Sequence, residues 1–134
     1  MFGALQTAHS GVRVARIWMD ATSDNIANVN TVRSTADPAF QARYVVAQAI
    51  EGRTNGVGSG ARVAAIRYGS AEGRLASWPD HPLADANGLV RMPDVDMSTE
   101  MTNLIMSQRS YQANLQVVRT AREAYQSALQ LGRK

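Results

Sequence analysis

The chain has 134 residues, of which 45% are hydrophobic and 19% are charged, and its formal net charge is +3. It contains no cysteine, which excludes disulfides, thiolate catalysis and cysteine-based zinc sites. Thirteen of its 14 basic residues are arginines, and they are scattered along the chain. A nucleic-acid-binding protein usually gathers such residues on one face or arm, so this distribution argues against nucleic acid as a partner.

The N-terminal residues 1–7 lack a basic segment followed by a long apolar core. We therefore expect no cleavable secretory signal. No run of the chain approaches the roughly 18 apolar residues that a membrane span requires. Neither a transmembrane segment nor direct lipid binding is expected.

A three–four spacing of apolar residues begins near the N-terminus and predicts a first amphipathic helix from about Phe2 to Asn30. Polar residues such as Arg13, Asp20 and Asn28 occupy the opposite face. The members of the stripe are Leu5, Ala8, Val12, Ala15, Met19, Thr22, Ile26 and Val29.

The middle of the chain has a different character. Residues 40–50 and 62–68 are rich in Val, Tyr and Ile with partial alternation, which predicts two strands. Glycines and an asparagine in residues 52–60 favour a hairpin connection between them. A third extended piece is expected at residues 74–78, and prolines with Asn-Gly then indicate an irregular segment up to Pro93.

A second long helix is predicted from Asp96 to the C-terminus, because neither Pro nor Gly interrupts the chain before Gly132. Asp96 is a candidate N-cap, and Glu100 places a negative charge near the positive helix end. Such a helix would be roughly 50 Å long. Its stripe at three–four spacing comprises Met101, Leu104, Gln108, Tyr111, Leu115, Val118, Arg122, Tyr125 and Leu129.

These elements predict a mainly α fold with a small β part. The long N- and C-terminal helices share one period, so we expect them to pair as a coiled coil, with each other or with neighbouring molecules. Residues 1–31 and 96–134 would form a discontinuous helical core domain, and residues 32–95 a central β-hairpin module. A globular two-helix core within one chain is the alternative.

Two loops contain residues that could form a ligand-binding site. The spacing Gly56-x-Gly58-x-Gly60 could cradle a phosphate, but such loops open a helix, whereas a strand is expected here and no Lys follows. The carboxylates of Asp94 and Asp96 could hold a divalent cation, but a helix N-cap explains them more simply. We expect neither a metal nor a cofactor.

His81 lies near Asp80 and Asp85, which raises the possibility of a catalytic or metal site. The only other histidine is His9, inside the first helix, and no His pair with metal-binding spacing exists. The sequence therefore predicts no catalytic residue and a protein that is not an enzyme, with an enzymatic site around His81 kept as an alternative.

Three segments resemble one known family. Residues 23–31, Ser-Asp-Asn-Ile-Ala-Asn-Val-Asn-Thr, are similar to the N-terminal signature of bacterial flagellar rod, hook and hook-associated proteins, although Asp24 replaces the usual Ser. Residues 107–114, Ser-Gln-Arg-Ser-Tyr-Gln-Ala-Asn, after Glu100-Met101, resemble the C-terminal signature. Residues 81–96 are similar to the segment typical of the C-type proximal-rod subunit of the basal body, and the short chain fits that subunit.

The resemblance implies a structural subunit that is exported unfolded by the flagellar type III apparatus and polymerises into the hollow rod that spans the periplasm. The terminal helices would line the channel and the central part would face outward. The implied partners are copies of itself, other flagellar rod subunits, the type III export apparatus and, as a further candidate, the membrane ring at the rod base.

We expect the residues that pack subunits together to lie on both helices. They are Leu5, Val12, Met19, Asn25, Ile26, Asn28, Asn30, Met101, Leu104, Arg109, Tyr111, Asn114, Leu115, Val118, Tyr125 and Leu129. The competing hypothesis is a soluble helical adaptor or a basic nucleic-acid-binding module, whose affinity for nucleic acid would fall steeply with salt.

Overall fold

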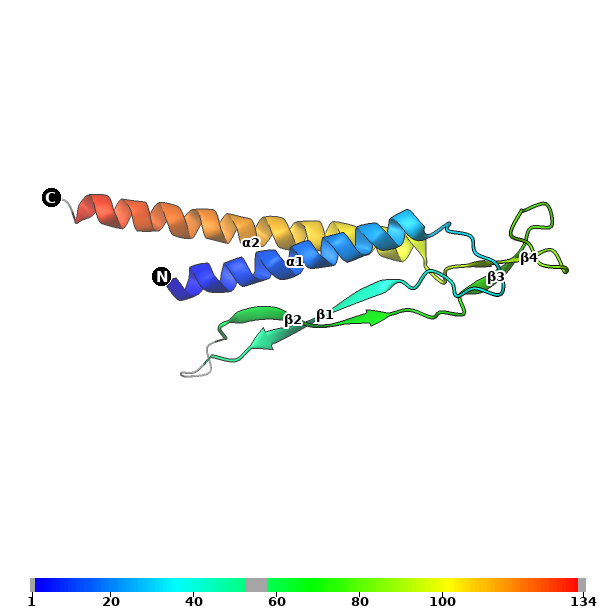
Figure 1. The fold of residues 1–134 in the computed structure, drawn as a ribbon. Coiled ribbons are helices and arrows are strands. Elements are labelled where there is room, and N and C mark those ends of the chain that lie inside the picture. Colours follow the sequence, from blue (N-terminus) through cyan, green and yellow to red (C-terminus); the bar gives the residue numbers. More distant parts are fainter. Residues whose placement is uncertain (1, 53–57, 133–134) are drawn as a thin grey trace.

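The chain forms an elongated molecule in which two long helices lie antiparallel and two β-hairpins are attached to them (Figure 1). This computed structural model describes residues 2–52 and 58–132. The elements in chain order are α1 (Phe2–Asn28), β1 (Arg43–Ile50), β2 (Gly60–Tyr68), β3 (Arg74–Ser77), β4 (Leu89–Met92) and α2 (Met97–Leu131). The prediction of a mainly helical fold with paired terminal helices and a small β part is confirmed.

The antiparallel hairpin of β1 and β2 runs along α1, and α2 lies on another side of the same helix (Figure 1). The strands begin at Arg43 and Gly60, rather than at the predicted residues 40 and 62. Residues 53–57 of the predicted hairpin connection lie outside the described residues. The second hairpin, β3 with β4, lies beyond the start of α2, at the end of the molecule away from both termini (Figure 1).

The expectation of an irregular segment up to Pro93 was wrong for its last part. Residues 89–92 form β4, in which Met92 lies opposite Arg74 and Leu89 opposite Ser77. A four-residue strand is too short to show a period of two, and Gly88 and Pro93 on either side signal turns rather than pairing. Gly88 makes the return before the strand with a φ of 72°.

Small side chains fill the seam between α1 and α2. A Cβ added at Gly11 would overlap with Oδ1 of Asn114, so this glycine lets the α2 side chain lie directly on the α1 backbone. Opposite α1, Ser107 is fully buried. Among the described residues, five of the seven buried hydrophobic residues are alanines; the seven are Ala8, Ala15, Ala21, Val29, Ala39, Ala42 and Val90.

A polar junction joins three elements at the end of α1. Asn25 is 1% exposed, and its Nδ2 donates to the carbonyl of Arg43 and to Oε2 of Glu100, both at 3.0 Å. Its Oδ1 accepts from the backbone N–H of Arg43 at 2.8 Å. Glu100, in the first turn of α2, is 2% exposed. One side chain thus fixes the start of β1 and the start of α2 against the end of α1.

Two further contacts hold the hairpins in place. Near the start of α1, Oγ of Ser10 accepts from the backbone N–H of Ala61 at 2.9 Å and so attaches β2 to the helix. At the other end, the guanidinium of Arg91 donates to the carbonyls of Thr35 and Glu72, and its backbone pairs with that of Arg33. The second hairpin is therefore fixed to the segment that leaves α1.

The predicted N-cap of α2 is confirmed. Asp96 has extended backbone angles, and its Oδ2 accepts from the backbone N–H of Thr99 at 2.8 Å and from Thr99 Oγ1 at 2.6 Å. These hydrogen bonds, the side-chain one above all, lower the pKa of Asp96. The helix ends at Leu131, and Gly132 is its C-cap.

We expect Asn25→Ala to lower the free energy of unfolding by about 2–4 kcal/mol, because the Glu100 carboxylate and the Arg43 backbone groups lose buried partners. Asn25→Asp should destabilise more at pH 7 than at pH 4, because two carboxylates would then share one buried site and one must bind a proton. Urea unfolding followed by circular dichroism measures both. Asn30→Ala, at an exposed position, is the matched control, and an equal effect of the two alanine substitutions would refute the role of the junction.

The cap on α2 should make stability depend on pH. Since the pKa of Asp96 is lower in the folded chain, its contribution to stability is present above the ordinary aspartate pKa and is lost as the pH falls through the folded pKa. Asp96→Ala should therefore lower the melting temperature at pH 7, with a smaller difference from the wild type at pH 3. The control is Asp94→Ala, outside the helix, and a pH-independent effect of Asp96→Ala would contradict the assignment.

Candidate functional site

Asp85 and His81, two of the residues considered for a catalytic site, make hydrogen bonds that stabilise the loop between β3 and β4. Asp85 accepts from the backbone N–H groups of Asn87 (2.8 Å) and Leu89 (3.0 Å) through Oδ1 and from Oγ1 of Thr35 through Oδ2. The backbone hydrogen bond from Leu89 is the main cause that lowers the pKa of Asp85. Nδ1 of His81 accepts from the backbone N–H of Leu83 at 3.1 Å. Both side chains thus have structural partners in the loop between β3 and β4.

Among residues 2–52 and 58–132, no group of three or more His, Asp or Glu side chains is arranged to hold a metal ion. The glycine spacing considered for phosphate lies partly outside the described residues, and strand β2 begins at its last member, Gly60. No helix in the described part of the chain is long and apolar enough to cross a bilayer.

The predicted stripe of α1 faces the interior of the molecule. Ala8, Ala15, Thr22 and Val29 are buried, and the four larger members are half-buried: Leu5, Val12, Met19 and Ile26. A spacing of three and four residues therefore located the covered face of this helix along its whole length.

In the first turns of α2, the buried residues precede the predicted stripe residues by one position in the sequence. Met101 is 54% exposed, whereas its neighbour Glu100 is buried, and the same offset separates exposed Gln108 from buried Ser107. The predicted packing residues that are half-buried are Leu104, Tyr111, Asn114, Leu115 and Val118. Arg109 is exposed. The apolar pattern missed the true centre of this face because that centre is polar.

The asparagines at the end of α1 differ in their surroundings. Asn25 is buried in the junction, whereas Asn28 is half-buried and Asn30 is exposed. Nδ2 of Asn28 donates to the carbonyl of Asp24 at 2.9 Å, and its Oδ1 accepts from Oγ1 of Thr31 at 3.1 Å. Asn28 thus stabilises the turn at which α1 ends.

Large hydrophobic side chains remain exposed on the outer faces of α2. Met97, Met101 and Ile105 follow one another at four-residue intervals, so they share one face, and they are 37%, 54% and 50% exposed. Met106 and Val117, at 53% and 49%, lie on a different face. Neither face contacts another element, because α1 is the element against which α2 packs among the described residues.

The last turns of α2 extend past the start of α1 (Figure 1). The contacts of Asn25 with Glu100 and of Gly11 with Asn114 set the antiparallel register, so Phe2 lies level with about residue 123. Beyond that level, Leu129 and Leu131 are 52% and 78% exposed. The fold therefore offers apolar helix surface along its length and at one end, which is the arrangement of a part that packs against other molecules.

Comparison with known proteins identifies the type of assembly. A family model described as "Flagella basal body rod protein" matches residues 5–33, and one described as "Flagellar basal body rod FlgEFG protein C-terminal" matches residues 86–131. These ranges contain most of α1 and all of α2.

Curated relatives match most of the chain. The flagellar basal-body rod protein FlgC of Yersinia enterocolitica is 40% identical over 85% of this chain and 84% of its own length. The protein of the same name from Salmonella typhimurium is 37% identical over the same shares, and that from Borreliella burgdorferi is 30% identical over 96% of this chain and 95% of its own length. With most of the chain covered at this identity, the chain belongs to the flagellar basal-body rod protein family.

Proposed function

We propose that this chain is a structural subunit of the proximal rod of the bacterial flagellar basal body. Its relatives are named as rod proteins of the basal body, and their similarity extends over most of the chain. The observation that supports a packing role most directly is the apolar outer surface of α2, where Met101 and Ile105 are at least half exposed.

A rod subunit of this kind would bury the outer faces of its helices against neighbouring subunits. Burial of apolar surface contributes roughly 25 cal/mol per Å², so a face more than thirty residues long supplies a substantial driving force. Helices packed side by side and nearly parallel to the axis would resist twisting, which a drive shaft requires. We assign this contact to the predicted packing residues that stay accessible, above all Met101, Arg109 and Leu129.

In this proposal the two helices, within residues 1–31 and 96–134, lie toward the axis and line the channel. Residues 32–95 with both hairpins face outward. The attachment of the first hairpin to α1 alone supports this arrangement, because it leaves the outer faces of α2 uncovered (Figure 1).

Partners beyond other rod subunits belong to the same proposal. The chain would be exported by the flagellar type III apparatus without a cleaved signal, would span the periplasm within the rod and would meet the membrane ring at the rod base. The absence of cysteine supports passage as an unfolded chain, because no disulfide needs to form or break on the way. We assign the chain a structural rather than a catalytic role.

The packing role predicts that Met101→Glu with Ile105→Glu abolishes swimming when this gene replaces the corresponding rod gene in a motile bacterium. Both positions are exposed in the single chain, so the folded subunit should tolerate the change, while a charge buried between subunits is costly. Motility on soft agar and the presence of rods in isolated basal bodies are the measurements.

The matched control is Ala64→Glu, at an exposed position of β2. It should leave motility within about twofold of the wild type, since surface substitutions away from contacts are nearly neutral. Normal rods with the doubly substituted chain would contradict the packing role of this face. Failure of the wild-type chain to restore any rod would refute the proposed function itself.

A further inference from the structure

Charge is unevenly distributed along the molecule. The half that contains the helix termini comprises residues 2–19, 58–64, 106–131 and the neighbouring end of β1 up to residue 52 (Figure 1). Among its described residues are two carboxylates, Glu51 and Glu123, and six arginines: Arg13, Arg16, Arg62, Arg109, Arg119 and Arg122. This basic half therefore has a formal charge of about +4.

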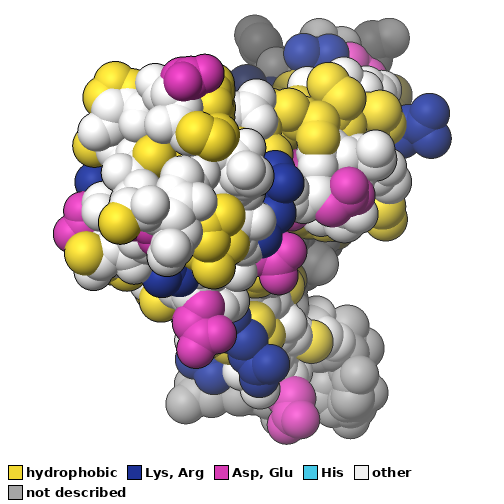
Figure 2. Space-filling view, turned by 90° about the vertical axis from the view of Figure 1, so that its right-hand side faces the viewer, with side chains coloured by type: hydrophobic (Ala, Val, Ile, Leu, Met, Phe, Trp, Pro, Cys, Tyr) yellow, Lys and Arg dark blue, Asp and Glu magenta, His cyan; other side chains and the backbone are white. Residues whose placement is uncertain are grey.

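The other half, residues 20–46 and 65–105, has the opposite sign. Its arginines are Arg33, Arg43, Arg67, Arg74 and Arg91. Its nine carboxylates are Asp20, Asp24, Asp37, Glu72, Asp80, Asp85, Asp94, Asp96 and Glu100. The net formal charge of these residues is about −4, so the described residues of the two halves have charges of opposite sign. Figure 2, which views the molecule from this end, shows carboxylates and arginines among exposed hydrophobic side chains.

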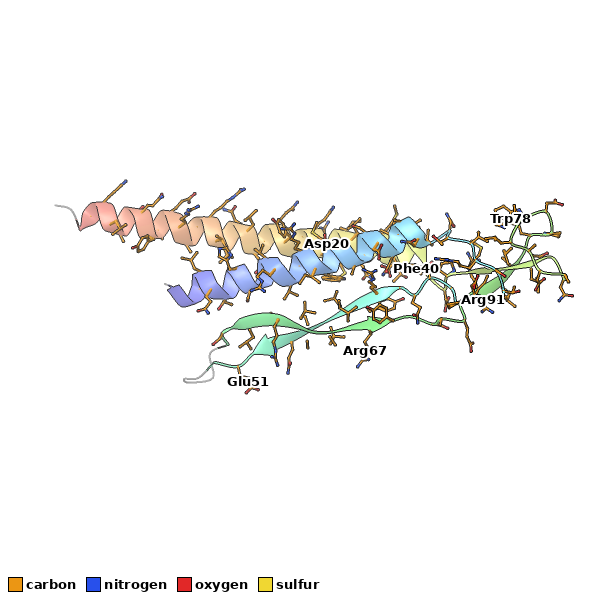
Figure 3. All side chains as sticks on the ribbon, in the orientation of Figure 1. Asp20, Phe40, Glu51, Arg67, Trp78 and Arg91 are labelled. Carbon is orange, nitrogen blue, oxygen red and sulfur yellow. The ribbon has the colours of Figure 1, made fainter. Side chains whose placement is uncertain are left out.

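The acidic end carries an apolar anchor. Trp78, in the loop between β3 and β4, is 49% exposed and lies at the far end of the molecule (Figure 3). Leu83 of the same loop is 44% exposed. Backbone hydrogen bonds from Trp78 N–H to the carbonyl of Gly88 (2.8 Å) and from His81 N–H to that of Trp78 (3.1 Å) hold the loop. A rigid exposed tryptophan loses little conformational entropy on binding.

The basic end carries a groove. It has a volume of about 780 Å³ and is lined by the start of α1, by α2 and by residues between β1 and β2. The lining includes Gly3 and Thr7 of α1, Asn114 and Val117 of α2, and Ser59. Apolar ligand sites of roughly 300–1,000 Å³ are typical, so the groove can take an indole ring with its neighbouring loop. Arg119 and Arg122 lie on α2 within two turns of Val117.

We propose that the acidic β3–β4 end of one copy of this chain binds the basic helical end of a second copy, with Trp78 in the groove beside Gly3 and Val117. The inference rests on the proposed function, because a head-to-tail contact between identical subunits continues from copy to copy and builds an axial structure. Opposite charges align the copies in one polarity and oppose a contact between two like ends.

The first test is sedimentation velocity of the purified full-length chain in low and high salt. Self-association should weaken at least about tenfold between 0.1 M and 1 M NaCl, over which the Debye length falls from about 10 Å to about 3 Å. Trp78→Ala should weaken it about tenfold in low salt, as expected for a central aromatic anchor. The matched control is Tyr68→Ala, which removes a side chain that is 62% exposed on β2. A monomer at every salt concentration overturns the proposal.

Charge-reversal variants test whether the acidic end and the basic end contact each other. Arg119→Glu with Arg122→Glu lowers the formal charge of the described basic half from about +4 to about 0, and Asp37→Lys with Asp80→Lys raises that of the acidic half from about −4 to about 0. Each variant alone should therefore lose its self-association, because one of its ends no longer attracts the other. An equal mixture of the two variants should recover association as pairs, since the unchanged acidic end of the first variant meets the unchanged basic end of the second. Circular dichroism checks that both are folded, and association of either variant alone at the wild-type level refutes the contact.

Crosslinking tests the geometry in the assembled rod. The chain has no cysteine, so Asp80→Cys with Arg122→Cys introduces two thiols separated by roughly 40 Å of helix and the second hairpin. Oxidation of basal bodies should give a ladder of dimers and larger species, while Tyr68→Cys with Arg122→Cys should give none. Normal rods without a ladder would refute this contact and leave the proposed function standing, whereas absence of rods with the wild-type chain would refute the function.

Discussion

The close approach of α1 and α2 is the constraint on which the rest of the structure depends. The seam between them is built from Ala8, Gly11 and Ala15 on one side and from Ser107 and Asn114 on the other. Because side chains of this size bring the helices together, little room remains in the seam for long hydrophobic side chains. The methionines and isoleucine of α2 therefore lie on its outer faces. The tight pairing within one chain and the apolar surface offered to other molecules have the same cause.

Polar groups give this seam its register. A line of alanines alone would allow the helices to slide by a turn at little cost, since one methyl group packs much like the next. Asn25 and Glu100 remove that freedom, because a shift would leave a carboxylate and an amide buried without partners. Register specified by a buried polar pair is a known device in paired helices, where it costs stability and gains uniqueness. Here the same amide also fixes the first residue of β1, so the position of the hairpin follows from the register of the helices.

The sequence alone predicted an element correctly where one local physical effect, such as apolar periodicity or helix capping, determined its structure. Helix α1 follows its apolar stripe closely, and the Asp96 cap of α2 follows from the hydrogen-bonding chemistry of its side chain. Prediction failed where tertiary contacts decided the outcome. Apolar periodicity could not anticipate that Glu100 is buried, because its partner is 75 residues away. Strand β4 is too short for its own pattern and depends on β3 and on the backbone of Arg33.

The exposed Trp78 also illustrates what a single sequence leaves open. A tryptophan between strands and prolines is compatible with a small core, and only the tertiary structure places it at the far end of the molecule with half of its surface accessible. The opposed charges of the two halves are not visible in the sequence for a related reason. Arginines that look scattered along the chain lie together once the antiparallel helices bring distant segments to the same level.

The antiparallel seam joins the first and last parts of the chain, which has a consequence for the order of events during synthesis. Gly11 contacts Asn114, so these two residues are close in space although most of the chain separates them in sequence. A ribosome that adds about 5–20 residues per second completes α2 several seconds after α1 has emerged. During that interval the stripe of α1 has no helix to cover it. A nascent or truncated chain that stops before Met97 would keep an uncovered apolar helix, and aggregation or capture by a chaperone would compete with folding until the last helix is made.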